Sequence, residues 1–147
     1  MMISEILDDD VERVIALWQV CGLSRPWNDP SRDLALARAS STSTILVGRA
    51  QEDPSSVVAS AMVGFDGHRG WVYYLAVAPS HQGRGLGRAM MTAAEDWLAA
   101  RGAGKVQLMV RTENGVARGF YDALGYEAQA TLVLGRWLER ETSEQTE

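Results

Sequence analysis

The hydrophobic positions near the start of the chain follow a strand period and then a helix period. Met2 to Leu7 alternates and predicts a first strand. Behind the acidic stretch Asp8 to Asp10, apolar residues recur at helical spacing and predict an amphipathic helix: Val11, Val14, Ile15, Trp18 and Cys21. Asp29 before Pro30 combines a favoured N-cap with a first-turn proline, so a second helix is expected to about Arg38.

The middle of the chain carries three runs that are typical of β-strands. Thr44 to Arg49 and Val57 to Phe65 are separated by turn-forming residues and predict a hairpin. A second turn, at Asp66-Gly67-His68-Arg69-Gly70, leads into Trp71 to Val77. Three antiparallel strands in sequence are therefore expected.

The pattern changes after Val77. A helix is expected from Leu86 to Arg101, a strand over Lys105 to Val110 and a helix over Asn114 to Leu124. A last strand is expected at Thr131 to Leu134, with a short extra one at Tyr126 to Ala128. The order βααβββαβαβ predicts a mixed α/β fold with a mostly antiparallel sheet of six to seven strands, about four helices and a βαβ crossover in the second half.

Length and composition limit the classes of protein that fit. A chain of 147 residues suits one domain, expected at 1–138, with a frayed polar tail at 139–147. Neither a signal peptide nor a membrane-spanning run is visible. A net charge of −5 with scattered basic residues argues against nucleic acid, and a single cysteine fits a reducing, cytoplasmic setting without a metal site. Cys21, on an apolar helix stripe, is expected to be a core thiol.

A glycine-rich segment between a strand and a helix is the main candidate for chemistry. It reads Gln82-Gly83-Arg84-Gly85-Leu86-Gly87-Arg88. A strand, a glycine loop and a helix together direct free backbone N–H groups and a positive helix end at an anion. The glycines let the backbone approach phosphate oxygens, and the arginines can add charge-assisted contacts. A pyrophosphate is the expected ligand.

Two other nucleotide-binding loops match this segment less well. The dinucleotide fingerprint requires glycine where Arg88 stands, and no acidic residue lies at 103–107 to bind a ribose. The P-loop requires Gly-Lys followed by Ser or Thr, and the segment lacks that triplet.

Two motifs in the right order resemble the GNAT N-acetyltransferase family. The signature Gln/Arg-x-x-Gly-x-Gly/Ala is matched by Gln82, Gly85 and Gly87. A second motif, Asn-x-x-Ala-x-x-Phe-Tyr, is matched by Asn114, Ala117, Phe120 and Tyr121. The segments Arg25 to Pro30 and Asp66 to Gly70 resemble the YpeA-type branch, so the resemblance covers nearly the whole folded chain.

The resemblance implies an enzyme that moves an acetyl group from acetyl-CoA to an amine by direct attack in a ternary complex. It places the CoA pyrophosphate on the loop from Gln82 to Arg88, through Gly83, Arg84, Gly85, Leu86 and Gly87. It places the pantetheine arm along the backbone of Leu75, Ala76 and Val77, with Asn114 beside it. Tyr121 matches the tyrosine near the CoA sulfur and is expected to be the general acid, since a phenol with a reference pKa near 10 can donate to a thiolate.

The general base and the acceptor stay open at the level of sequence. The strand position where many relatives carry a glutamate is Tyr73. Asp66, His68 and Glu113 are nearby in sequence, and the reference pKa of histidine near 6.5 suits His68 to the role. A water relay to solvent can also serve, so no base is assigned. Candidates for the acceptor cleft are Arg25, Trp27, Asn28, Asp66, His68 and Tyr73. The expected acceptor is a small molecule or peptide amine, not nucleic acid or membrane, and the expected assembly is a monomer or a homodimer. The alternatives are a CoA-binding sensor that lost turnover, and an unrelated nucleotide-binding module.

Overall fold

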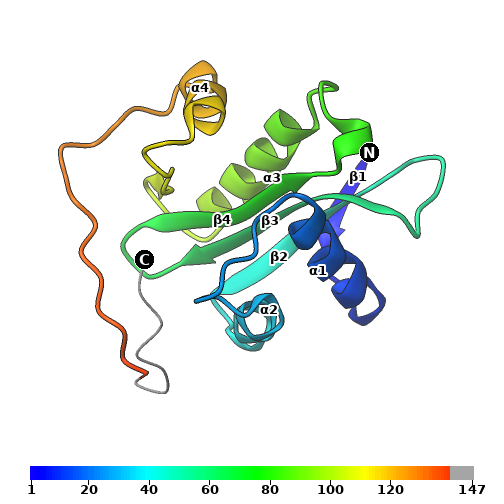
Figure 1. Cartoon of the computed structure of the whole chain (residues 1–147), viewed down its shortest axis with the longest axis horizontal. Helices are drawn as coiled ribbons and strands as arrows, with labels where there is room; N and C mark the ends of the chain where they lie inside the picture. Colours follow the sequence, from blue (N-terminus) through cyan, green and yellow to red (C-terminus); the bar gives the residue numbers. More distant parts are fainter. Residues whose placement is uncertain (140–147) are drawn as a thin grey trace. The chain divides into compact units, whose positions relative to one another are not determined.

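The computed structural model describes residues 1–139, and its contacts divide the chain into two units. The first, Met1–Leu108, contains one sheet with helices against it (Figure 1). Its elements in chain order are β1 (Met2–Glu5), the 3-10 turn η1 (Asp8–Asp10), α1 (Val11–Val20), α2 (Pro30–Ala39), β2 (Ser43–Arg49), β3 (Val57–Phe65), β4 (Gly70–Val77), the 3-10 turn η2 (Pro79–His81), α3 (Leu86–Ala100) and β5 (Val106–Gln107).

The second unit, Met109–Glu147, contains the helix α4 (Gly115–Ala123). The expected single domain over 1–138 stays a prediction. The expected frayed tail lies outside the described residues except for Glu139. Across residues 1–139, no helix is both long enough and apolar enough to cross a membrane.

The sheet has the strand order β1-β2-β3-β4-β5. The first four strands pair antiparallel, and β5 pairs parallel to β4 after the α3 crossover. The predicted mixed α/β class, the mostly antiparallel sheet and the βαβ crossover are therefore confirmed.

The predicted number of strands, six to seven, is too high for the described residues. Five strands are paired there, β5 is only two residues long, and neither Tyr126 to Ala128 nor Thr131 to Leu134 is in a strand. The run of leucine and valine after Thr131 has the composition of a strand. A strand also requires a paired neighbour, and composition does not supply one.

Helices cover both faces of the sheet (Figure 1). On one face α1 and α2 pack against β2, β3 and β4 around a core cluster that includes Val14, Trp18, Ile45 and Ala76. On the other face α3 buries Met90, Met91, Ala94 and Leu98. A Cβ atom added at Gly70 would lie 2.7 Å from a Leu98 methyl carbon, so glycine at the start of β4 lets α3 pack close to the sheet.

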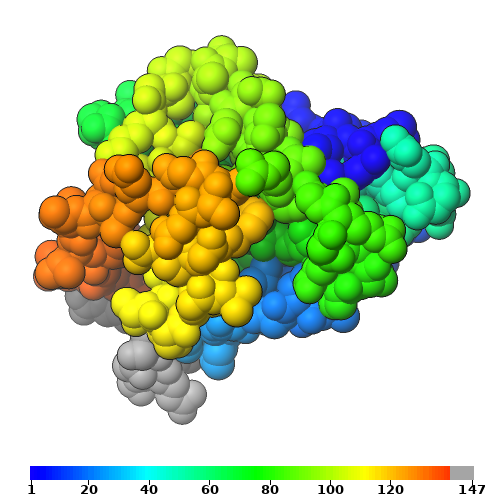
Figure 2. All heavy atoms as spheres, turned by 90° about the horizontal axis from the view of Figure 1, so that it is seen from above, coloured from blue at the N-terminus to red at the C-terminus, as the bar shows by residue number. Residues whose placement is uncertain are grey.

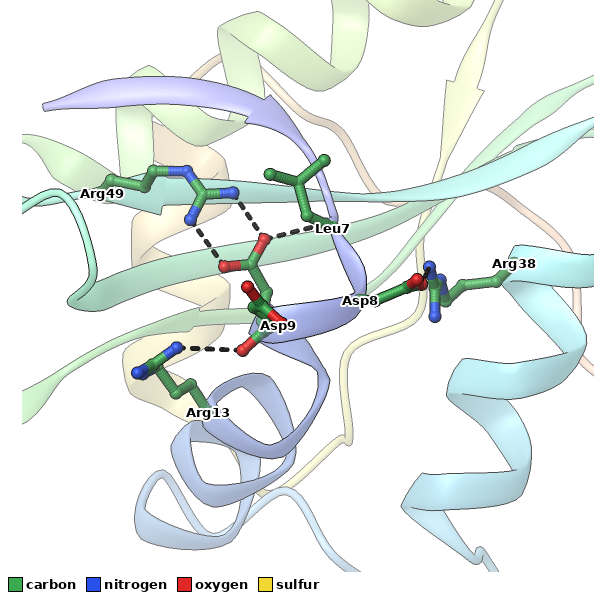
Figure 3. Close-up of polar contacts among 7 residues, drawn as sticks. Leu7, Asp8, Asp9, Arg13, Arg38 and Arg49 are labelled. Carbon is green, nitrogen blue, oxygen red and sulfur yellow. Dashed lines mark hydrogen bonds and ion pairs between the residues drawn. The ribbon is translucent and has the colours of Figure 1, made fainter.

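A buried ion pair joins η1 to the end of β2. Arg49 donates from its two terminal nitrogens to the two carboxylate oxygens of Asp10, at 2.6 Å and 2.5 Å (Figure 3). The same carboxylate accepts a hydrogen bond from the backbone N–H of Leu7 at 2.8 Å. Asp10 is 2% exposed, so its charge depends on these partners. The Arg49 hydrogen bond is the largest contribution that lowers the pKa of Asp10.

Asp8 makes a second ion pair in the same region, and this one lies at the surface. It binds Arg38 of α2 (Figure 3), but the Asp8 side chain is 92% exposed. Exposed pairs contribute little because water screens them and two flexible side chains must be held. The contributions of the exposed Asp8 pair and the buried Asp10 pair to stability can therefore be compared directly.

We expect Asp10→Asn to lower the free energy of unfolding by about 3 to 5 kcal/mol at neutral pH, because it leaves Arg49 buried without its counter-charge. Since the folded pKa of Asp10 is lowered, its stabilisation is present above the unfolded value near 3.9 and is lost as pH falls through the folded value. Urea unfolding of the wild type and of Asp10→Asn from pH 7 to pH 3 tests this. The difference between their free energies of unfolding should become smaller toward pH 3.

The matched control is Asp8→Asn, which should cost roughly 1 kcal/mol or less. Equal losses for the two variants, or a loss for Asp10→Asn that does not vary with pH, would contradict the assigned role of the buried pair.

Candidate functional site

The glycine loop follows β4 and opens α3, as the sequence predicts. Gly83 and Gly85 have φ of 79° and 76°, a left-handed conformation that favours glycine. A Cβ atom at either position would meet no protein atom within 4 Å. The loop backbone is thus bare on its outer side, and in Figure 2 the green atoms of this segment lie at the surface.

Gly85 is the N-cap of α3 and has no side chain with which to cap it. The first intrahelical bond runs from the N–H of Ala89 to the Gly85 carbonyl, so the N–H groups of Leu86, Gly87 and Arg88 precede the helical hydrogen-bond pattern. Arg84 and Arg88 are exposed beside them. Free backbone donors and the positive end of the helix dipole, with two arginines next to them in sequence, are the features of an anion site.

The loop is tied to the end of β4. The amide of Gln82 donates to the Val77 carbonyl at 3.2 Å, and the thiol of Cys21 donates to the same oxygen at 3.4 Å. Gln82 therefore turns back onto the strand. Cys21 is half-buried and packs against the core cluster, and burial raises the pKa of its thiol, which keeps it protonated.

Among the described residues, the edge of β4 opposite β3 pairs with another strand at only one end. Only Gly70 and Trp71 pair with β5, through Val106 and Gln107. The following residues of β4 pair with β3 alone, up to Val77 opposite Ala59. Strand backbone without a neighbour can bind an extended ligand, and Leu75, Ala76 and Val77 lie in this open stretch.

A bulge interrupts the pairing at the middle of β4. Ser60 pairs with Ala76 and Met62 pairs with Tyr73, so Tyr74 and Leu75 together lie opposite Ala61. Tyr74 has φ of 53° and is the one non-glycine residue with positive φ in the described chain. The sequence gives no sign of this bulge, because tyrosine is not a residue type that favours a left-handed backbone.

The residues of the second motif lie at the start of α4 and along it. Asn114 is the N-cap of this helix and accepts a hydrogen bond from the N–H of Ala117 at 3.0 Å. Tyr121 makes edge-to-face contacts with Phe120 and Tyr126. Burial raises the pKa of Tyr121 to about 12, so its hydroxyl stays protonated at physiological pH.

The candidates for the acceptor cleft fall on two segments. On the first, between α1 and α2, Arg25 and Asn28 form an isolated β-bridge and Arg25 donates to the Gly22 and Ser24 carbonyls. Trp27 lies between them and is partly buried.

The second segment is the β3–β4 turn. Asp66 accepts hydrogen bonds from the N–H groups of His68 and Arg69, which lower its pKa, and from the indole of Trp71 at 3.2 Å. His68 is exposed. Tyr73 is 42% exposed and stacks on Trp71, as expected for neighbours on one strand face. Among residues 1–139, no group of three or more metal-binding side chains is found.

Comparison with other proteins places this geometry in a family. The model of the acetyltransferase (GNAT) family matches residues 10–126. An acetyltransferase of Yersinia pestis is 44% identical over 130 residues, which cover 88% of this chain and 90% of the relative. An acetyltransferase of Yersinia enterocolitica is 42% identical over 138 residues, 94% of this chain and 96% of the relative.

Solved structures share the fold at lower identity. The aminoglycoside N-acetyltransferase AAC(6')-Iy in complex with CoA has a TM-score of 0.77 at 16% identity and covers 93% of this chain and 94% of its own. Glucosamine-6-phosphate N-acetyltransferase from Arabidopsis thaliana has a TM-score of 0.67 at 18% identity, with coverage of 94% and 98%. The family match spans most of the chain and includes both motifs, so this protein belongs to the GNAT acetyltransferase family.

Proposed function

We propose that this protein transfers the acetyl group of acetyl-CoA to an amine by direct attack in a ternary complex. The observation that carries the proposal is the bare, glycine-capped start of α3 at the end of a strand whose outer edge is open. Membership of the family supports the same reaction, and a neighbour in fold binds CoA. We also propose that the chain belongs to the YpeA-type branch of the family, because the segments Arg25 to Pro30 and Asp66 to Gly70 resemble that branch.

The donor would bind in two parts. The pyrophosphate would accept hydrogen bonds from the N–H groups at the start of α3, with Arg84 and Arg88 adding charge. The pantetheine arm would lie along the open edge of β4 at Leu75 to Val77, where its amides can bond strand backbone. Asn114 would approach this arm, although its side-chain oxygen already caps α4.

The reaction itself needs few groups. The amine nitrogen attacks the thioester carbonyl carbon, a C–N bond forms, and a backbone N–H of β4 stabilises the oxyanion. The C–S bond then breaks, the sulfur leaves as thiolate, and the nitrogen loses its extra proton. Cys21 is no candidate for a covalent intermediate, because its thiol is protonated and bonded to the Val77 carbonyl.

Tyr121 would act at the leaving sulfur. A phenol with a pKa of about 12 is always protonated at neutral pH, so it can donate a hydrogen bond to the thiolate as charge develops. Full transfer of its proton to a thiolate of reference pKa near 8.5 would run uphill. We therefore assign Tyr121 as a hydrogen-bond donor that stabilises the thiolate, in place of the general acid that the sequence predicts.

The acceptor amine would enter between the α1–α2 segment and the β3–β4 turn. Trp27, Arg25 and Asn28 would line one side of this cleft, and Asp66, His68 and Tyr73 the other. Asp66 is a weak base, because its lowered pKa reflects hydrogen bonds that favour the charged form. We therefore propose that water carries the amine proton to solvent. Small-molecule amines are the first acceptors to test, because a structural neighbour is an aminoglycoside N-acetyltransferase.

Acetyl-CoA should stabilise the folded protein in a thermal shift measurement. At a concentration of 100 times Kd the gain is about 2.7 kcal/mol. Gly85→Ala should weaken this gain, because the added methyl meets no protein atom and lies where the phosphates would approach. A wild-type protein that gains no stability from acetyl-CoA would overturn the proposed function.

Gly102→Ala is the matched control for the glycine variant. Gly102 also has positive φ, 95°, and open space around its Cβ position, but it follows the far end of α3. Both variants should lose some intrinsic stability from the strained backbone. Only Gly85→Ala should show a weaker stabilisation by acetyl-CoA.

Tyr121→Phe should lower kcat by about 100-fold or more, the usual contribution of one hydrogen-bond donor to a developing negative charge, and leave the KM for acetyl-CoA nearly unchanged. Thiol release over a panel of amines, peptides and aminoglycosides provides the assay and also separates an enzyme from a CoA-binding sensor. Tyr126→Phe is the control, because Tyr126 packs against the same ring. Equal rates for Tyr121→Phe and wild type would exclude the assigned role.

A further inference from the structure

We infer that Tyr74 is a positioning residue of the donor site, whose clamped side chain holds the bulged backbone of β4 in the shape that receives the thioester. The inference rests on the proposed function, since it concerns the same strand edge. It goes further in assigning a role to Tyr74, Trp18 and Asp33, which neither motif contains.

The bulge needs something to hold it. A tyrosine with φ of 53° is strained, and such a conformation persists only where the surrounding contacts determine it. Leu75, Ala76 and Val77 follow directly, so the direction of their N–H groups depends on this turn of the backbone. The contacts of the Tyr74 side chain therefore bear on the open edge of β4.

The ring of Tyr74 is clamped on α1. It stacks on the indole of Trp18 with 4.0 Å between ring centroids and 13° between planes, and Trp18 is fully buried. The Trp18 N–H donates to the Ser60 hydroxyl at 2.8 Å, and that hydroxyl donates to the Tyr74 carbonyl at 3.2 Å. Side chain and backbone of Tyr74 are thus fixed by the same tryptophan, directly and through Ser60.

The far end of the side chain is clamped on α2. The Tyr74 hydroxyl donates to the Asp33 carboxylate at 2.7 Å, and Asp33 lies in the first turn of the helix. Asp29 caps that turn by accepting from the N–H groups of Ser31 and Arg32. Burial, together with Asp33, raises the pKa of Tyr74, so this hydroxyl is a permanent donor and not a base.

The two clamps link the bulge to both helices on one face of the sheet. The segment between α1 and α2 carries Arg25, Trp27 and Asn28, the proposed wall for the acceptor. Through Tyr74, the backbone that would contact the acetyl group is held in a fixed relation to the two helices that bracket this wall. A positioning role predicts that loosening the clamp affects the acetyl group more than the rest of the donor.

The test compares acetyl-CoA with CoA by calorimetry. Only acetyl-CoA has the thioester carbonyl oxygen. The affinity for acetyl-CoA divided by the affinity for CoA therefore measures the contact between this oxygen and the backbone of β4. Tyr74→Phe keeps the stacked ring and removes the bond to Asp33, and Asp33→Ala removes it from the other side. Both should lower the ratio by about two- to tenfold, the worth of one hydrogen bond, with CoA affinity retained. Asp33→Asn, whose amide oxygen still accepts from Tyr74, should restore most of the ratio.

Ile45→Val is the control for a loss of core packing, because Ile45 is fully buried in the same cluster and lies on β2. It should lower the melting temperature and leave the ratio unchanged. An unchanged ratio in Tyr74→Phe, a wild-type ratio of one, or an equal fall in Ile45→Val would each overturn the inference. Failure of wild type to bind either ligand would instead overturn the proposed function.

Discussion

The left-handed backbone of Tyr74 is the constraint on which the site depends. Gly70 lies on the face of the sheet that packs against α3. If side chains alternated regularly along β4, Tyr74 and Ala76 would lie on this same face. The bulge moves both to the opposite face, where Tyr74 stacks on Trp18 and Ala76 joins the core. Beyond the bulge β4 pairs with β3 as far as Val77, while no described strand pairs with its other edge beyond Trp71.

The glycine loop is bare on the outside and fixed on the inside. The Val77 carbonyl accepts from both Gln82 and Cys21, which joins the loop, the strand end and α1 at one oxygen. His81 lies 3.7 Å from Glu52 of the β2–β3 hairpin, a second link at the surface. A loop held in this way loses little entropy when it binds an anion, and preorganisation of this kind favours affinity.

Local features could be predicted from the sequence, and features that depend on distant residues could not. Asp29 and Pro30 predict the start of α2, and Gln82 to Gly87 predicts the loop. Helix caps and glycine turns depend on residues that are neighbours in the sequence. Tyr74 meets Asp33 across 41 positions and Trp18 meets Ser60 across 42, so neither contact has a local signal. Asp10 reads as a first-turn acid, and only the fold pairs it with Arg49. The prediction of a last strand at Thr131 to Leu134 was wrong for the same reason, since strand pairing depends on residues that are distant in the sequence.

Tyr73 occupies the strand position at which the resemblance to the family leads one to expect a glutamate, and its surroundings suggest why an acid is absent there. Tyr73 lies opposite Met62, and both Met62 and Tyr74 pack against the core cluster on the side of α1 and α2. The bulge therefore lets the consecutive residues Tyr73 and Tyr74 face the same side of the sheet. One of them, Tyr74, is bound to Asp33, while Tyr73 stacks on Trp71 beside Asp66. An acid at position 73 would lie next to the charged Asp66 and be repelled by it. The aromatic residue avoids this repulsion, which is consistent with an enzyme that positions its amine by contact and leaves proton removal to water.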